Sequence, residues 1–266
     1  MTERERPTTS LTPETEGWRF LSFAVHRPTS AVDVSQPDQE IAVVPLSGSI
    51  TATVDGRDVE LSRTSVFDQM PTILYVPPGA SLTIEGEGEC SVGSAPAEGR
   101  YDIRVFTPDE MKTELRGGGA AYRQVVHALA PPLPAERLII YEVYVPRGMW
   151  SGWPPHCHDG YDGSPYLEET YYFRTDPADG FCMHRNWRVD EPFDETHVAH
   201  DGDVVTVPKG YHSSVGAPGS HMFFLNYLAG ELVAEERSTP PCFHSAYTWI
   251  EEDWEAKGWE LPKVAP

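Results

Sequence analysis

The stretch GDVVTVPKGYH at residues 202–212 has a shorter counterpart, YVPPGA, at residues 75–80. In both, a strand-forming run ends in a Pro-x-Gly turn, and such turns separate neighbouring strands. Because the same strand-and-turn unit occurs once in each half of the chain, the sequence predicts a duplicated β barrel.

Segments rich in Val, Ile, Thr and aromatic residues surround both units. Between residues 18 and 95 they are separated by turn signals such as Asp55-Gly56. They follow one another too closely for crossover helices, which predicts antiparallel strands and an all-β fold. The predicted parts are a polar tail at residues 1–16, an N-terminal barrel at 17–120, and a C-terminal barrel with a C-terminal extension at 121–266.

The chain is strongly acidic, with 41 Asp and Glu against 20 Lys and Arg and a formal net charge of −21. This charge opposes binding to nucleic acid. An anionic small molecule remains compatible, because the charges inside a pocket set its local field. The sequence does not exclude a homo-oligomer.

Hydropathy and cysteine usage predict a soluble, cytoplasmic protein without a membrane partner. No apolar run approaches the roughly 20 residues that a membrane-spanning helix needs, and the start of the chain has no signal-peptide pattern. The cysteines lack Cys-x-x-Cys spacing, which suits a reducing compartment. They are Cys90, Cys157, Cys182 and Cys242.

A set of metal-ligand residue types lies in the second half. In PPHCHDGYDGSPYLEETYYF, residues 154–173, the side chains of His156 and His158 would project from the same face of a strand. Ten residues separate His158 from Glu169, which is enough for a turn and a return strand. His212 is the last residue of the stretch at residues 202–212. Three imidazoles and one carboxylate suit one divalent ion among zinc, manganese, iron, cobalt and nickel. Calcium is disfavoured because it prefers oxygen ligands.

The first half lacks such a set. Its Pro-x-Gly turn is followed by Ala80 and Ser81, with no histidine beside them, and its only histidine is His26. The N-terminal barrel is therefore expected to be a scaffold without a metal.

Longer stretches resemble the 5-deoxy-glucuronate isomerase family of inositol catabolism, which is related to the 4-deoxy-hexosulose-uronate ketol-isomerases. The resemblance implies a bicupin fold of two jelly-roll barrels and a metal held by His156, His158, Glu169 and His212. Glu169 is preferred to Glu168 because it precedes the Thr-Tyr-Tyr-Phe strand, as the ligand does in relatives. The stretches are PLSGSITATVDG (45–56), RTSVFDQMPTILYVPPGA (63–80), SAPAE (94–98), GMWSGWPPHCHD (148–159), LEETYYFR (167–174), GFCMHRNW (180–187), DGDVVTVPKGYH (201–212) and APGSHMFFLNYLAG (217–230).

The reaction that the resemblance implies is aldose–ketose isomerisation of 5-deoxy-glucuronate to 5-dehydro-2-deoxy-gluconate. A metal ion with open coordination positions would act on the carbonyl and the neighbouring hydroxyl as a Lewis acid. The candidate proton carriers are Glu168, Tyr171 and His184. The candidate ligands for the substrate carboxylate are Arg185, Arg174 and Lys209.

Four positions depart from the family pattern around the expected pocket mouth. Cys157 stands where lysine is usual, Met149 where asparagine is, His184 where glutamine is, and Ser213 where proline is. These departures leave open a cupin isomerase or epimerase that acts on another sugar acid. A cupin dioxygenase with the same ligand set and a non-catalytic sugar-binding module are further alternatives.

Overall fold

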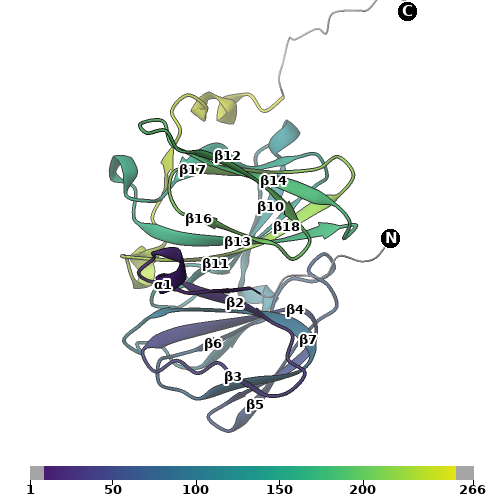
Figure 1. Ribbon diagram of the computed structural model, residues 1–266, viewed down its shortest axis with the longest axis vertical. Coiled ribbons are helices and arrows are strands. Elements are labelled where there is room, and N and C mark those ends of the chain that lie inside the picture. Colours follow the sequence, from purple (N-terminus) through teal and green to yellow (C-terminus); the bar gives the residue numbers. More distant parts are fainter. Residues whose placement is uncertain (1–8, 256–266) are drawn as a thin grey trace, which may run out of the picture.

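The computed structural model describes residues 9–255 and consists of β strands joined by turns and short helical segments. Two β barrels lie one above the other, with the N-terminal half in purple and blue below and the C-terminal half in green and yellow above (Figure 1). The predicted all-β, two-barrel fold is confirmed. Within residues 9–255, no helix has the length and apolar character needed to cross a membrane.

The N-terminal barrel is one eight-stranded antiparallel sheet in the order β1-β2-β7-β4-β6-β8, with β3 paired to β7 and β5 to β4. Its two longest strands pair from Gln39↔Pro96 to Val54↔Leu82, with a register shift at Pro45. Its strands are β1 (Ser10–Leu11), β2 (Ser22–His26), β3 (Val32–Asp33), β4 (Gln39–Val54), β5 (Arg57–Arg63), β6 (Ile73–Val76), β7 (Leu82–Pro96) and β8 (Arg104–Phe106).

The C-terminal barrel consists of two sheets, in the orders β16-β13-β18-β11-β10-β9 and β15-β14-β17-β12-β19. Apolar side chains such as Val125, Phe173 and Phe224 fill the space between them. Its strands are β9 (Lys112–Arg116), β10 (Arg123–Leu129), β11 (Ile139–Val145), β12 (Trp150–Cys157), β13 (Leu167–Asp176), β14 (Phe181–Trp187), β15 (Asp194–His200), β16 (Val204–Val207), β17 (Tyr211–Gly216), β18 (His221–Gly230) and β19 (Cys242–Phe243).

The helical segments are each about one turn long and lie in the connections. They are α1 (Pro13–Glu16) and the 3-10 segments η1 (Pro108–Glu110), η2 (Gly119–Ala121), η3 (Tyr161–Gly163), η4 (Ala234–Arg237) and η5 (Thr248–Glu252). The last lies in the C-terminal extension, where the ring of Tyr247 packs against that of Trp153 with centroids 5.0 Å apart.

Two short strands lie close to the predicted domain boundaries. Residues 1–8 of the predicted tail lie outside the described residues, but Ser10–Leu11 pairs with β2, and Thr12 caps α1. β9 already pairs with β10, so the change of sheet precedes the predicted boundary between residues 120 and 121.

The two barrels share one hydrophobic core. Phe23 and Tyr75 of the first barrel belong to the same buried cluster as Tyr172 and Tyr227 of the second. The hydroxyl of Tyr227 is 3.1 Å from Oγ of Ser91 and donates to a main-chain carbonyl of β4 at 3.2 Å. The outer face of the second barrel's larger sheet is therefore buried against the first barrel.

A buried carboxylate, Glu40, connects the barrels through main-chain groups. It accepts hydrogen bonds from three successive backbone N–H groups at residues 136–138, at 2.8, 2.6 and 2.6 Å. It also accepts one from the hydroxyl of Tyr75 at 2.8 Å. These charge-assisted bonds compensate the desolvation of the carboxylate, and its removal would leave several buried donors without a partner.

We therefore expect Glu40→Ala to lower the free energy of unfolding by about 2–4 kcal/mol, because buried donors lose a charged acceptor. Glu85, exposed on the same barrel, is the matched control, and Glu85→Ala should change the free energy by less than about 0.5 kcal/mol. Urea denaturation measures both values. Equal stability of the two variants would contradict this role for Glu40.

Candidate metal centre

Three histidines, two on paired strands and one directly after a strand, converge inside the C-terminal barrel. β12 carries His156, His158 follows directly after it, and His212 lies opposite His156 on β17. One potential ligand nitrogen from each ring lies within 4.8 Å of the others. β12 and β17 lie side by side in the upper barrel (Figure 1). The strand register thus brings together residues that are more than 50 positions apart.

Glu169 on β13 completes the group from the opposite sheet. Its Oε2 lies 2.9 Å from Nε2 of His158 and 3.3 Å from Nε2 of His212. All four predicted ligands therefore lie together. The carboxylate and two of the imidazoles are buried, and His156 is the least buried of the three histidines.

The hydrogen bonds around the rings orient His158 and leave one ligand atom of His212 unused. Nδ1 of His158 donates to the carbonyl of Leu167 at 3.1 Å, which orients the ring so that Nε2 lies 2.9 Å from Oε2 of Glu169 and is hydrogen-bonded to it. Nε2 of His212 is buried and has no hydrogen-bond partner within the described residues. A buried nitrogen without a partner is costly, and a metal ion would give it one. The donor set therefore fits a divalent transition ion.

The electrostatics of two of the three rings favour the neutral imidazole that ligation requires. Desolvation of the ring, followed by the neighbouring His158 and the charge of Arg123, lowers the pKa of His156 to about 3. Burial also holds the pKa of His212 well below its usual value. Burial acts in the same direction on His158, but the hydrogen bond and charge of Glu169 outweigh it and raise that pKa.

Two of the predicted proton carriers lie beside this group. The ring centroid of Tyr171 is 5.8 Å from that of His212 and 4.6 Å from that of His184. Both nitrogens of His184 are engaged, by Oγ of Ser214 at 2.8 Å and by Oδ1 of Asn186 at 2.9 Å. Burial, followed by the charge of Glu169, raises the pKa of Tyr171 well above 10, so its hydroxyl stays protonated.

The third candidate, Glu168, lies on the other face of β13 because neighbouring residues of a strand point in opposite directions. Its carboxylate accepts hydrogen bonds from three successive backbone N–H groups at residues 19–21, at 2.6, 2.9 and 2.8 Å. It thus joins the two barrels and does not face the histidines. This placement argues against a role in proton transfer.

The three predicted carboxylate-binding cations are paired elsewhere. Arg185 occupies an outward position of β14 and makes a bidentate pair with Asp194, with both distances 2.8 Å. Arg174 pairs with Asp201 at 2.7 Å and with Glu89 at 3.2 Å, and Lys209 pairs with Glu191 at 2.7 Å. A different cation, Arg123, is buried near His156, although no motif in its local sequence marks it as a site residue.

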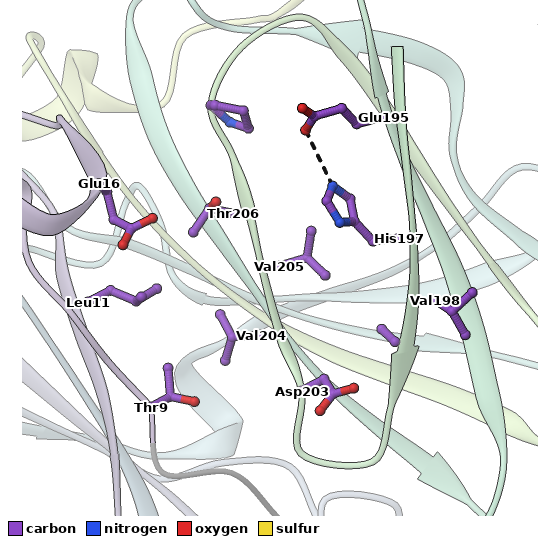
Figure 2. Close-up of a pocket in the computed structure, with 12 residues that line it drawn as sticks. Thr9, Leu11, Glu16, Glu195, His197, Val198, Asp203, Val204, Val205 and Thr206 are labelled. Carbon is purple, nitrogen blue, oxygen red and sulfur yellow. Dashed lines mark ion pairs between the residues drawn. The ribbon is translucent and has the colours of Figure 1, made fainter.

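A surface cleft of about 450 Å³ lies beside the segment that carries β1 and α1, and none of the four candidate metal ligands lines it (Figure 2). An ion pair between Glu195 and His197, at 3.6 Å, forms part of its wall. Figure 2 also shows the carboxylates of Glu16 and Asp203 at the cleft, which make it unsuited to an anionic sugar. The cleft is lined by Thr9, Leu11, Glu16, Glu195, His197, Val198, Ala199, Asp203, Val204, Val205, Thr206 and Pro208.

The sequence is similar to one protein family and to several named enzymes. A model of the KduI/IolB family matches residues 1–250. The 5-deoxy-glucuronate isomerase of Geobacillus kaustophilus is 37% identical over 230 residues, which cover 83% of each chain. The protein of the same name from Bacillus subtilis strain 168 is 36% identical over 202 residues, which cover 72% of this chain and 74% of the relative.

Solved structures show the same fold. The crystal structure of an IolB-like protein from Salmonella typhimurium superposes with a TM-score of 0.86 at 30% identity, covering 93% of this chain and 96% of that one. An oxalate decarboxylase from Lactobacillus farciminis has a TM-score of 0.58 at 12% identity, covering 85% of this chain and 82% of its own. The second likeness concerns the fold alone, and it supports the predicted bicupin architecture.

If the four residues form one metal site, His158→Ala should reduce bound metal from about one ion per chain to a small fraction, because the site loses one of its ligands. His197→Ala removes a histidine of the surface cleft and should leave the metal content unchanged. Elemental analysis of both variants after dialysis checks this expectation. Unchanged stoichiometry in His158→Ala would place the metal elsewhere.

Proposed function

The chain belongs to the KduI/IolB family, and from this premise we propose that it is a metal-dependent aldose–ketose isomerase that converts 5-deoxy-glucuronate to 5-dehydro-2-deoxy-gluconate in myo-inositol catabolism. Isomerase chemistry is common to the curated relatives, which carry the name 5-deoxy-glucuronate isomerase. The observation that carries the metal dependence is the convergence of three histidines and Glu169 inside the second barrel.

The four ligands would hold one divalent ion, with the identity among zinc, manganese, iron, cobalt and nickel left open. Such an ion supplies Lewis acidity at adjacent carbonyl and hydroxyl oxygens. The protein orients the ligands: the carbonyl of Leu167 holds the ring of His158, and the main-chain pairing of β12 with β17 holds His156 opposite His212. The ligand geometry is thus fixed before substrate binds, as electrostatic catalysis requires.

Among the three predicted proton carriers, we propose Tyr171. It lies beside His212, with ring centroids 5.8 Å apart, where its hydroxyl can donate a proton to a substrate oxygen. Both nitrogens of His184 are already hydrogen-bonded, and Glu168 faces the first barrel. This proposal rests on the position of Tyr171 beside the candidate metal ligands.

The remaining features agree with an enzyme that acts on a small sugar acid. All four cysteines are free thiols, in keeping with a reducing compartment, so we propose a cytoplasmic location. The net charge of −21 opposes nucleic acid as a partner.

The metal-replete protein should convert 5-deoxy-glucuronate without consuming oxygen, because Lewis-acid chemistry needs no electron transfer. Proton NMR under anaerobic conditions should show loss of the signals derived from the aldehyde, and a zinc-loaded sample should retain activity. In D₂O, transfer of the proton through a protein group should place deuterium in the product. Product that forms only with iron and oxygen would favour a cupin dioxygenase instead. Absence of turnover would indicate another sugar acid or a binding role.

The variants Tyr171→Phe and Glu168→Gln test the functions of the two faces of β13 separately. Loss of the Tyr171 hydroxyl should lower kcat by about 100-fold at unchanged metal content, as removal of a proton donor does. Glu168→Gln should lower the free energy of unfolding by about 1–3 kcal/mol while kcat of the folded protein changes little. Steady-state kinetics and urea denaturation give both values. A large loss of kcat in the folded Glu168→Gln variant would show that Glu168 has a role in catalysis and would contradict this assignment.

A further inference from the structure

A uronate presents two ends to a binding site, an aldehyde and a carboxylate. The proposed metal accounts for the aldehyde end only. The carboxylate needs a cation, but Arg185, Arg174 and Lys209 each form ion pairs with protein carboxylates. A cation near the histidines without such a partner would serve this purpose.

Arg123 has the required position. It is the first residue of β10, and it shares a face of that strand with Val125, whose side chain lies in the core of the C-terminal barrel with Tyr171. Its Nη2 donates to the carbonyl of Trp153, three residues before His156 on β12, at 3.2 Å. The guanidinium therefore lies inside the barrel, on the side of the least buried ligand.

The bonding of Arg123 is incomplete. Although only 7% exposed, it makes no ion pair with any carboxylate of the described residues. Its partners are two main-chain carbonyls, of Trp153 and of Ala121, the latter at 2.9 Å. A guanidinium has five N–H donors, and two hydrogen bonds to neutral carbonyls do not compensate the burial of its charge.

The buried arginine Arg63 shows the alternative arrangement in the same molecule. Its guanidinium makes a bidentate pair with Glu142, at 2.6 and 2.9 Å, and a further bond with Tyr144 at 3.0 Å. There the protein provides the anion. At Arg123 it does not, and burial lowers the pKa of Arg123 to about 10.

We propose that Arg123 binds the carboxylate of the substrate and makes the site selective for sugar acids over neutral sugars. This inference rests on the proposed function, because it assigns the second end of the same substrate. A planar guanidinium can accept a carboxylate in a bidentate arrangement. The substrate would then supply the anion that the fold omits.

The test compares a charged and a neutral ligand on metal-loaded protein. D-Glucuronate and D-glucuronamide have nearly the same shape but differ in the negative charge. Isothermal titration calorimetry should show glucuronate binding to the wild type at least about tenfold more tightly, because a hydrogen bond to a charged acceptor is stronger than one to a neutral amide. In Arg123→Gln this preference should disappear, and in Arg123→Lys part of it should remain.

Kinetics with 5-deoxy-glucuronate give a second readout. We expect KM of Arg123→Gln to rise by about 10–100-fold with a smaller change in kcat, whereas Arg185→Gln, on the outer face of β14, should leave both unchanged. Metal content and thermal unfolding identify variants that have lost the fold, and for those the comparison of the two ligands on wild type still decides. Equal binding of glucuronate and glucuronamide by the wild type would overturn the proposal.

The two proposals fail in different ways. If folded, metal-replete Arg123→Gln turns over 5-deoxy-glucuronate with the KM of the wild type, the role of Arg123 is wrong and the isomerase stands. If the wild type does not turn over 5-deoxy-glucuronate but prefers glucuronate through Arg123, the substrate assignment is wrong and the carboxylate site stands.

Discussion

The alternation of side chains along β13 is the constraint on which the rest of the structure depends. Glu169 and Tyr171 point into the second barrel, toward His158, His212 and His184. Glu168 and Tyr172 point the other way, into the contact with the first barrel. A shift of one residue in register would exchange the two faces. It would bury the wrong carboxylate in each environment, so the ligand geometry and the barrel interface are specified together.

The first barrel supports the second through buried carboxylates that bind main-chain N–H groups. Glu40 binds the segment at residues 136–138, and Glu168 binds the segment at residues 19–21. Each contact joins a strand of one barrel to a connecting segment of the other. Because a buried carboxylate is stable only with all its donors in place, these contacts hold the barrels in a single arrangement. The first barrel can in this way keep in register the strands of its neighbour that carry the candidate metal ligands.

The electrostatics of the interior differ from those of the surface. The chain as a whole carries a net charge of −21, and the surface cleft beside β1 is acidic. Inside the second barrel, burial lowers the pKa values of His156 and His212, the carboxylate of Glu169 is paired with His158, and Arg123 contributes a buried positive charge. Fields in a buried site are set by nearby groups and weakly screened. An anionic sugar can therefore be favoured there although the surface average opposes it.

The sequence by itself determined the strand periodicity, the all-β class and the set of metal-ligand residue types, because these depend on local spacing and on the chemistry of each side chain. It also located His156, His158, Glu169 and His212, which the structure brings together. Only the tertiary structure decided which charged residues face the site. Arg185 and Lys209 lie in recognisable motifs yet pair with carboxylates outside the site, while Arg123 resembles an ordinary surface cation in the sequence. The reason is physical: burial and ion pairing depend on strand register and on residues distant in the chain, which no local pattern encodes.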